Sequence, residues 1–321
     1  MVNSVRVIPI KCTFGRAFSY AYYIDAPEPV LIDTGVMSSP SQVMEPALAK
    51  HGLRLEDVKW ILLTHGHADH IGGTREIWEL TERNAEVVIH QKEAVLLRER
   101  QAHVKSHEQL QGLYLDPSIL TQQTGILMEV IGDEIEPTRE LAGGESLKLG
   151  GNLSITVVPT PGHSVGSVTY LLDGLDWAFV ADAVQGGGTL GTRFPSIEHP
   201  ALYRQSLKHL LMDVRPQRMY LGHHYLGLNG DIIREQVEGE EVPAVLEASL
   251  EIEARMAKAA RRHLIDGSQI KVNEGPYAPF TAIAEELGYT GDTRILPSPF
   301  FITIHGYQEE LMALKMKGER K

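Results

Sequence analysis

Short runs of mostly apolar residues, separated by polar and glycine-containing segments, recur along the first two-thirds of the chain. Such runs are typical of buried strands. They fall at residues 30–32, 60–63, 87–90, 153–158, 177–180 and 219–221. Between them, residues 40–51, 74–84 and 200–212 carry apolar side chains at the spacing of amphipathic helices. We therefore expect an α/β fold in which two strand-rich halves are flanked by helices.

Two stretches depart from this pattern. Residues 91–140 are longer than a simple connection requires, and we interpret them as an insertion that could form a lid. A helix is predicted from Val242 to about Leu264, with acidic residues before its start and basic residues near its end. The apolar run at residues 300–304 favours a strand. The predicted organisation is a main domain over residues 1–230 and a mostly helical appendage over residues 231–321.

Histidine and aspartate residues follow directly on the predicted strands. The densest group is Thr64-His65-Gly66-His67-Ala68-Asp69-His70, which follows the apolar run at 60–63. His65 and His67 lie on a tight turn and can converge on one cation, which leaves Asp69 and His70 to hold a second. Imidazole and carboxylate ligands without cysteine suit zinc, iron or manganese rather than a closed structural zinc site. Because ligands at strand ends gather at one edge of a sheet, we expect a metal site there.

Five motifs in this chain resemble, in their order, those of the metallo-β-lactamase superfamily. They are Leu31-Ile32-Asp33-Thr34-Gly35, the motif from His65 to His70, Thr160-Pro161-Gly162-His163-Ser164-Val165-Gly166-Ser167, Phe179-Val180-Ala181-Asp182-Ala183 and Tyr220-Leu221-Gly222-His223-His224. Together they cover about residues 5–225. The resemblance implies a four-layer αβ/βα sandwich with metals at one edge, followed by the helical appendage.

The resemblance also implies the metal ligands. The expected ligands of one divalent ion are His65, His67 and His163, those of a second are Asp69, His70 and His223, and Asp182 bridges the two. Asp33 is expected to orient a ligand histidine through the other ring nitrogen. Zinc is the expected metal, with iron or manganese as alternatives.

The implied reaction is hydrolysis by a hydroxide that bridges two metal ions. Asp69 and Asp182 are the carboxylates expected at the catalytic centre. His224 and Tyr225 lie beside a ligand, and either could donate a hydrogen bond to the developing oxyanion.

Three further residues are interpreted as a substrate wall. Phe14 and Phe18 fall in the loop that overhangs the metals in this family. Gln185 stands three residues after the bridging aspartate, where many N-acyl homoserine lactonases have a tyrosine. The expected function is glyoxalase II-like or lactonase-like hydrolysis of a small ester, lactone or thioester. The alternatives are a phosphodiesterase on the same site, a mononuclear iron oxygenase of the persulfide-dioxygenase type and, last, a non-catalytic module.

Composition limits the partners. With 30 basic and 42 acidic residues the net charge is −12, which opposes non-specific binding to nucleic acid. Cys12 is the only cysteine, so a reducing compartment is expected. No run approaches the roughly 18 apolar residues of a membrane-spanning helix, and residues 1–10 lack the apolar core of a signal peptide. We expect a cytoplasmic enzyme with a small-molecule substrate and without nucleic-acid or membrane partners. Its appendage could complete the pocket, mediate formation of a homodimer, or do both.

Overall fold

The computed structural model describes residues 5–264, 275–296 and 298–318. Residues 1–4, which belong to the stretch considered for a signal peptide, lie outside the described residues, as do 265–274, 297 and 319–321 of the predicted appendage. Among the helices in the described ranges, none combines the length and the apolar character needed to cross a bilayer.

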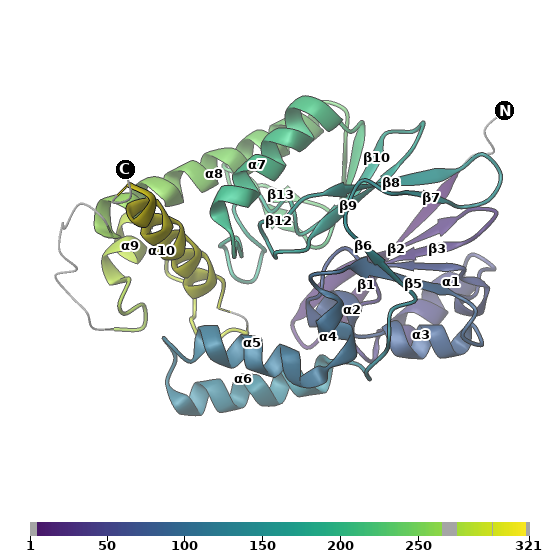
Figure 1. The fold of residues 1–321 in the computed structure, drawn as a ribbon, viewed down its shortest axis with the longest axis horizontal. Helices are drawn as coiled ribbons and strands as arrows, with labels where there is room; N and C mark the ends of the chain where they lie inside the picture. The colour runs from purple at the N-terminus through teal and green to yellow at the C-terminus, as the bar shows by residue number, and fades with distance from the viewer. Residues whose placement is uncertain (1–4, 265–274, 297, 319–321) are drawn as a thin grey trace.

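The N-terminal half forms a six-stranded sheet whose strand order follows the sequence (Figure 1). The first three strands form an antiparallel meander, and the third to sixth strands run parallel. Parallel neighbours require crossover connections, and helices supply them. The strands are β1 (Arg6–Phe14), β2 (Ala17–Asp25), β3 (Val30–Ile32), β4 (Trp60–Leu62), β5 (Glu86–His90) and β6 (Arg139–Leu141). The connecting helices are α1 (Glu45–Ala49), α2 (Ala68–Ile71), α3 (Thr74–Leu80), α4 (Ala94–Arg98), α5 (Arg100–Gln111) and α6 (Pro117–Val130).

The second half forms another six-stranded sheet, in the order β14-β11-β10-β9-β8-β7. All neighbours are antiparallel except β10 and β11, which run parallel and are joined through α7 (Pro200–His209). The strands are β7 (Ser146–Lys148), β8 (Ser154–Pro159), β9 (Val168–Leu172), β10 (Trp177–Ala181), β11 (Arg218–Leu221) and β14 (Gln236–Glu238). A two-stranded ribbon of β12 (Tyr225–Leu226) and β13 (Ile232–Ile233) lies beside it.

The two sheets pack face to face, and helices cover both outer faces. Strand β2 shows why: alternate residues point to opposite faces, so Tyr22 and Ile24 join the core between the sheets, while Ala21 and Tyr23 join the core under the first helices. A third core lies between the second sheet and the helices α7, α8 (Glu241–Leu264), α9 (Thr281–Leu287) and α10 (Pro299–Gly318). The predicted four-layer sandwich with a helical C-terminal region is confirmed.

One predicted element differs from the structure. The run at residues 300–304, predicted as a strand, is the start of α10 and lies buried in the third core. A short run of apolar residues can belong to a buried strand or to a buried helix, and the sequence alone does not tell which.

The predicted helix α8 is confirmed almost to the residue. The chain beyond the predicted boundary at residue 230 continues into the sandwich, because β14 pairs with β11 and α8 packs on the same sheet.

The insertion at residues 91–140 is a helical hairpin. Helix α6 was not predicted, although it has a start signal: the Asp116 side chain accepts a hydrogen bond from the Ser118 backbone N–H at 2.8 Å, and Pro117 occupies the first turn. The hairpin is tied to the C-terminal region, since Gln123 donates to the carbonyl of Arg294 at 2.9 Å and the Tyr114 hydroxyl lies 2.5 Å from His305 Nδ1. A lid role for this hairpin stays a prediction.

A buried carboxylate joins helices α7, α8 and α10, which pack around the third core. Glu253 of α8 is 2% exposed and accepts two hydrogen bonds from the Arg204 guanidinium of α7, at 2.9 and 2.6 Å. The Tyr307 hydroxyl of α10 donates to the same carboxylate at 3.0 Å. Because burying a charge is costly unless it is paired and hydrogen-bonded, this cluster fixes how the three helices meet.

Replacing Glu253 with Ala should therefore destabilise the fold. Breaking a buried pair leaves its partner uncompensated, but the Arg204 side chain is 31% exposed and can still reach Glu310. We expect a loss of about 2–3 kcal/mol in the free energy of unfolding, below the usual range for a fully buried charge. Urea denaturation measures it. Glu251→Ala, at an exposed position of the same helix, should stay within about 0.5 kcal/mol; equal losses for both variants would contradict the assignment.

Candidate metal centre

The predicted ligands meet at the edge of the sandwich where several strands end. His65 and His67 follow β4, and His67 is the N-cap residue of α2, whose first turn carries Asp69 and His70. His163, Asp182 and His223 follow β8, β10 and β11 of the other sheet. The site is thus built from both sheets, and every ligand lies in a short segment anchored by a buried strand.

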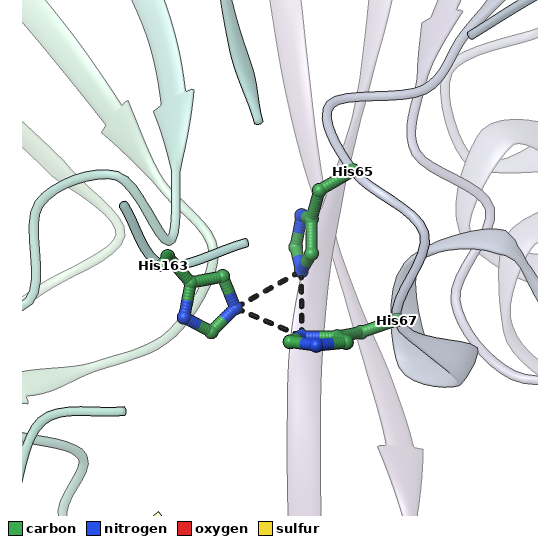
Figure 2. Close-up of side chains that lie close together, drawn as sticks. All are labelled: His65, His67 and His163. Atoms are coloured by element: carbon green, nitrogen blue, oxygen red, sulfur yellow. Dashed lines mark hydrogen bonds between the residues drawn. The ribbon is translucent and has the colours of Figure 1, made fainter. Parts of the chain in front are cut away.

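Three histidines form a compact triangle (Figure 2). His65 Nε2 lies 3.1 Å from His67 Nδ1 and 3.2 Å from His163 Nε2, and the third side measures 2.9 Å. Nitrogen ligands at 2.0–2.1 Å from a tetrahedral zinc would lie about 3.3 Å apart. The spacing of the three nitrogens therefore fits a single metal ion.

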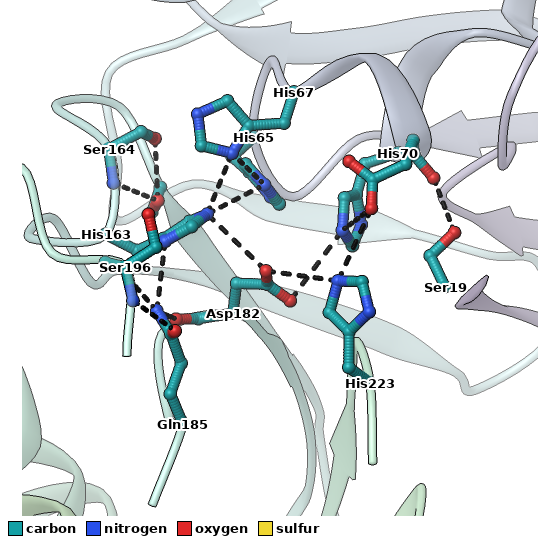
Figure 3. A network of polar contacts seen from close by, with 12 residues as sticks. Ser19, His65, His67, His70, His163, Ser164, Asp182, Gln185, Ser196 and His223 are labelled. Atoms are coloured by element: carbon teal, nitrogen blue, oxygen red, sulfur yellow. Dashed lines mark hydrogen bonds and ion pairs between the residues drawn. The ribbon is translucent and has the colours of Figure 1, made fainter. Parts of the chain in front are cut away.

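A second group lies beside the first. Asp69 Oδ2 is 3.6 Å from His70 Nε2 and 3.4 Å from His223 Nε2. The Asp182 carboxylate lies between the two groups (Figure 3): its oxygens are 3.5 Å from His163 Nε2 in the triangle, and 3.3 and 3.7 Å from His223 and His70 Nε2. The structure brings all seven predicted ligands together in three overlapping clusters.

The hydrogen bonds on the outer side of the rings decide which nitrogens face inward as lone pairs. His163 Nδ1 donates to the Ser196 carbonyl at 2.7 Å, and His223 Nδ1 donates to the Phe18 carbonyl at 2.6 Å. His70 Nδ1 donates to the Asp33 carboxylate at 2.8 Å. A neutral imidazole carries one N–H, so in its neutral form each of these rings presents Nε2 as an acceptor directed at other acceptors.

This arrangement is unfavourable without a cation. His70 Nε2 is buried and lacks a hydrogen-bond partner among the described residues. Burial, reinforced by the neighbouring histidines, holds the pKa of His65 well below its usual value. Burial alone would raise the pKa of Asp182, but His223 and His70 keep it well below its usual range. Burial alone would lower the pKa of His70, but the carboxylates of Asp69, Asp182 and Asp33 raise it to about 10. Divalent metals bind neutral imidazoles and ionised carboxylates, so a metal ion at the second group would replace a proton there, and the residues fit two metal ions.

Asp33 has the position predicted for it. Its Oδ2 accepts from His70 Nδ1, and its Oδ1 accepts from the Thr64 backbone N–H at 2.8 Å, immediately before the ligand His65. Asp33 is 2% exposed and its backbone has φ +58°, in the left-handed region that aspartate and asparagine tolerate better than most residues. The Asp33 carboxylate thus orients the His70 ring of the second group and fixes the start of the loop that carries His65 and His67.

The two predicted oxyanion donors point elsewhere. The Tyr225 hydroxyl is buried and donates to Asp182 Oδ1 at 2.9 Å. His224 Nε2 lies 3.0 Å from the Tyr20 hydroxyl and 2.8 Å from Glu235 Oε2, and its ring stacks on Tyr20. In this geometry Tyr225 supports the Asp182 carboxylate, and His224 belongs to a polar cluster beside the site.

The three residues predicted to form a substrate wall have different surroundings in the structure. Phe18, on β2 rather than in a loop, contacts the rings of His223 and His224, with centroids 6.4 and 5.1 Å apart. Phe14 is the last residue of β1 and is half-buried. Gln185 is 2% exposed, and its amide donates to the Ser196 carbonyl at 2.8 Å, beside His163 (Figure 3). Because this bond uses the polar amide of Gln185 inside the protein, the side chain supports the surroundings of the ligand His163.

Three residues near the site were missed by the sequence analysis. Glu198 Oε1 lies 3.4 Å from His67 Nε2, on the outer side of that ring. Tyr20 is part of the cluster around His224. Glu93 contacts both loops that carry the triangle. None of them lies in a motif, and only folding brings them to the site.

Asp33→Asn should weaken the second metal group. The amide keeps the size of the side chain and suits the positive φ, but its NH₂ faces either Thr64 N–H or His70 Nδ1. If it faces His70, the ring must shift its proton to Nε2 and can no longer bind a metal. We expect affinity for one metal ion per chain to fall about 10–100-fold, as measured by zinc titration against a chromophoric chelator. Asp25→Asn, at the exposed pair with Arg6, is the control; unchanged affinity in both variants would refute the role of Asp33.

Comparison with known proteins extends this picture. The chain is 30% identical over 185 residues to a hydroxyacylglutathione hydrolase of Rhodopseudomonas palustris (strain BisB18), covering 57% of this chain and 54% of that protein. It thus spans about half the length of that relative. It is 26% identical over 229 residues to the uncharacterized protein YobT of Bacillus subtilis (strain 168), covering 68% of this chain and 84% of that one.

Solved structures share the fold. A metallo-beta-lactamase family protein from Thermus thermophilus has a TM-score of 0.67 at 20% identity, covering 97% of this chain and 94% of that chain. A superfamily protein from Sulfolobus tokodaii has a TM-score of 0.55 at 20% identity, covering 94% and 98% of the two chains. The family model described as the metallo-beta-lactamase superfamily matches residues 14–223. The chain therefore belongs to the metallo-β-lactamase superfamily.

Proposed function

We propose that this protein is a dinuclear metal-dependent hydrolase that cleaves a small ester, lactone or thioester. The observation that carries the proposal is the position of Asp182, whose carboxylate faces the histidine triangle on one side and the group of Asp69, His70 and His223 on the other. A mononuclear site would need only one of these groups. Zinc is the expected metal, with iron or manganese as alternatives.

Two divalent cations bound there would lower the pKa of a water molecule to near neutrality and polarise a substrate carbonyl. The chain's own groups prepare the site for this. Tyr225 holds the Asp182 carboxylate from behind, and Asp33 and the Phe18 carbonyl fix the rings of His70 and His223. Because these supports are buried and already in place, little reorganisation is needed when substrate enters.

The choice of an acyl substrate rests on the relative with the printed activity of a hydroxyacylglutathione hydrolase, which favours a thioester. Near the site, Lys11 lies over one face of the Phe18 ring, with its Nζ 3.9 Å from the ring centroid. An apolar surface beside a cation suits an acyl compound that carries a carboxylate or another anionic group. The proposal includes a free small molecule as substrate and a cytoplasmic setting, the latter in keeping with a single, buried cysteine.

The test of the reaction class is a panel of substrates. Protein loaded with zinc, manganese or iron would be given a glutathione thioester, acyl lactones, simple esters and a phosphodiester, and proton release would be followed. We expect turnover of one acyl class, with the thioester fastest. Turnover of the phosphodiester alone would replace the proposal with a phosphodiesterase. No turnover, together with one iron per chain, would point to the oxygenase.

The test of the site is the pair of metal removal and Asp182→Ala. Chelation should abolish turnover, and added metal should restore it, because bound metal would be needed to activate the attacking water. Asp182→Ala should reduce turnover at least about 10³-fold while leaving the circular dichroism spectrum unchanged. Asp213→Ala, an exposed carboxylate that pairs with His209, should leave turnover intact. Normal turnover in the Asp182 variant would refute the assignment.

A further inference from the structure

A single buried carboxylate links the two loops that carry the histidine triangle. Glu93 lies just after β5, at the start of α4, and is 2% exposed. Its Oε2 accepts a hydrogen bond from the Gly66 backbone N–H at 2.8 Å. Its Oε1 accepts from the Gly166 backbone N–H and from the Ser164 hydroxyl, both at 2.7 Å. One side chain therefore bonds to two segments that are far apart in the sequence.

The bonded groups are immediate neighbours of the metal ligands. Gly66 stands between His65 and His67, and Ser164 follows His163. The distance between these two loops determines how far His163 Nε2 lies from the other two ligand nitrogens. Glu93 thus holds the two halves of the triangle, which come from different sheets, at a fixed separation.

Two glycines make room for this carboxylate. A Cβ atom on Gly66 would lie 2.6 Å from Glu93 Oε2, and one on Gly166 would lie 2.4 Å from Glu93 Cγ. Both values are shorter than real contacts of a Cβ atom. The close approach of the carboxylate therefore requires glycine at both positions, within two of the motifs that the sequence displays.

The negative charge of Glu93 would also favour a metal cation bound nearby. All three hydrogen-bond donors are neutral groups. A cation bound in the adjacent triangle would complement the buried anion across a short, poorly screened path. The second group is held differently, since His70 is oriented by Asp33 and His223 by the Phe18 carbonyl.

We propose that Glu93 is a positioning residue of the three-histidine site, which sets the affinity of that site for metal and leaves the site of Asp69, His70 and His223 nearly unaffected. This inference rests on the proposed dinuclear centre. Glu93 touches no ligand atom itself; it acts through the loops.

Glu93→Gln is the test, because the amide has the same shape but one oxygen becomes an N–H donor. That donor must face Gly66 N–H on one loop or Gly166 N–H on the other, so one bond is lost and replaced by a repulsive contact. Zinc affinity would be measured by competition with a chromophoric chelator in two backgrounds. His223→Ala leaves only the triangle intact, and His163→Ala leaves only the second group.

In the His223→Ala background, Glu93→Gln should weaken zinc binding about 10–100-fold, as loss of an outer support of a metal ligand usually does. In the His163→Ala background the change should stay below about threefold. Ser164→Ala, which removes one of the three bonds without adding a donor, should give a smaller loss in the first background alone. It keeps the test informative if Glu93→Gln folds poorly.

Glu145→Gln is the matched control. That carboxylate also accepts two backbone hydrogen bonds, from Ala142 at 2.7 Å and Gly143 at 2.9 Å, but neither belongs to a loop that carries a ligand. It should not change zinc affinity in either background. Equal losses at both sites, or none, in the Glu93 variant would overturn the inference. If the unsubstituted protein binds no zinc, the proposed function fails instead.

Discussion

The repulsion among ligand atoms that face one another is the constraint on which the site depends. Imidazole nitrogens and carboxylate oxygens of seven residues point into one small volume, and their outward hydrogen bonds prevent most of the rings from turning away. Such an arrangement is stable only if the scaffold around it is rigid and a cation offsets the repulsion. The packed sandwich supplies the rigidity, and bound metal ions would supply the charge.

The supports of the site come from the same strands that build the core. Phe18 and Tyr20 lie on β2, whose other residues fill the cores on both faces of the first sheet. The Phe18 carbonyl then orients His223 from the opposite sheet. Because of this sharing, the distance between the sheets and the geometry of the metal groups are not independent. Changes in the packing between the sheets should therefore shift the positions of the ligands, because only short backbone segments separate the two.

The sequence could predict the ligands because each lies in a motif of a few residues that follows a strand. The order of five such segments, rather than any one of them, indicated the metal site. The roles of Tyr225, His224 and Gln185 could not be predicted in this way. Adjacency to a ligand says little about where a side chain points, and all three proved to use their polar atoms on neighbours within the protein. Helix α10 shows the same limit, since its apolar start resembles a strand until its neighbours are known.

The sequence by itself indicated the α/β class and a metal site at the strand ends, because strand periodicity and the histidines and aspartates that follow the strands are local properties of the chain. The full set of expected ligands came from the resemblance of five motifs to a known family. Only the tertiary structure decided which groups support the ligands. Glu93, Glu198 and Tyr20 have no local signature, and they act at the site because folding brings distant segments within hydrogen-bonding reach. Hydrogen bonds of this kind depend on positions in space to within a fraction of an ångström, which no spacing along the chain encodes.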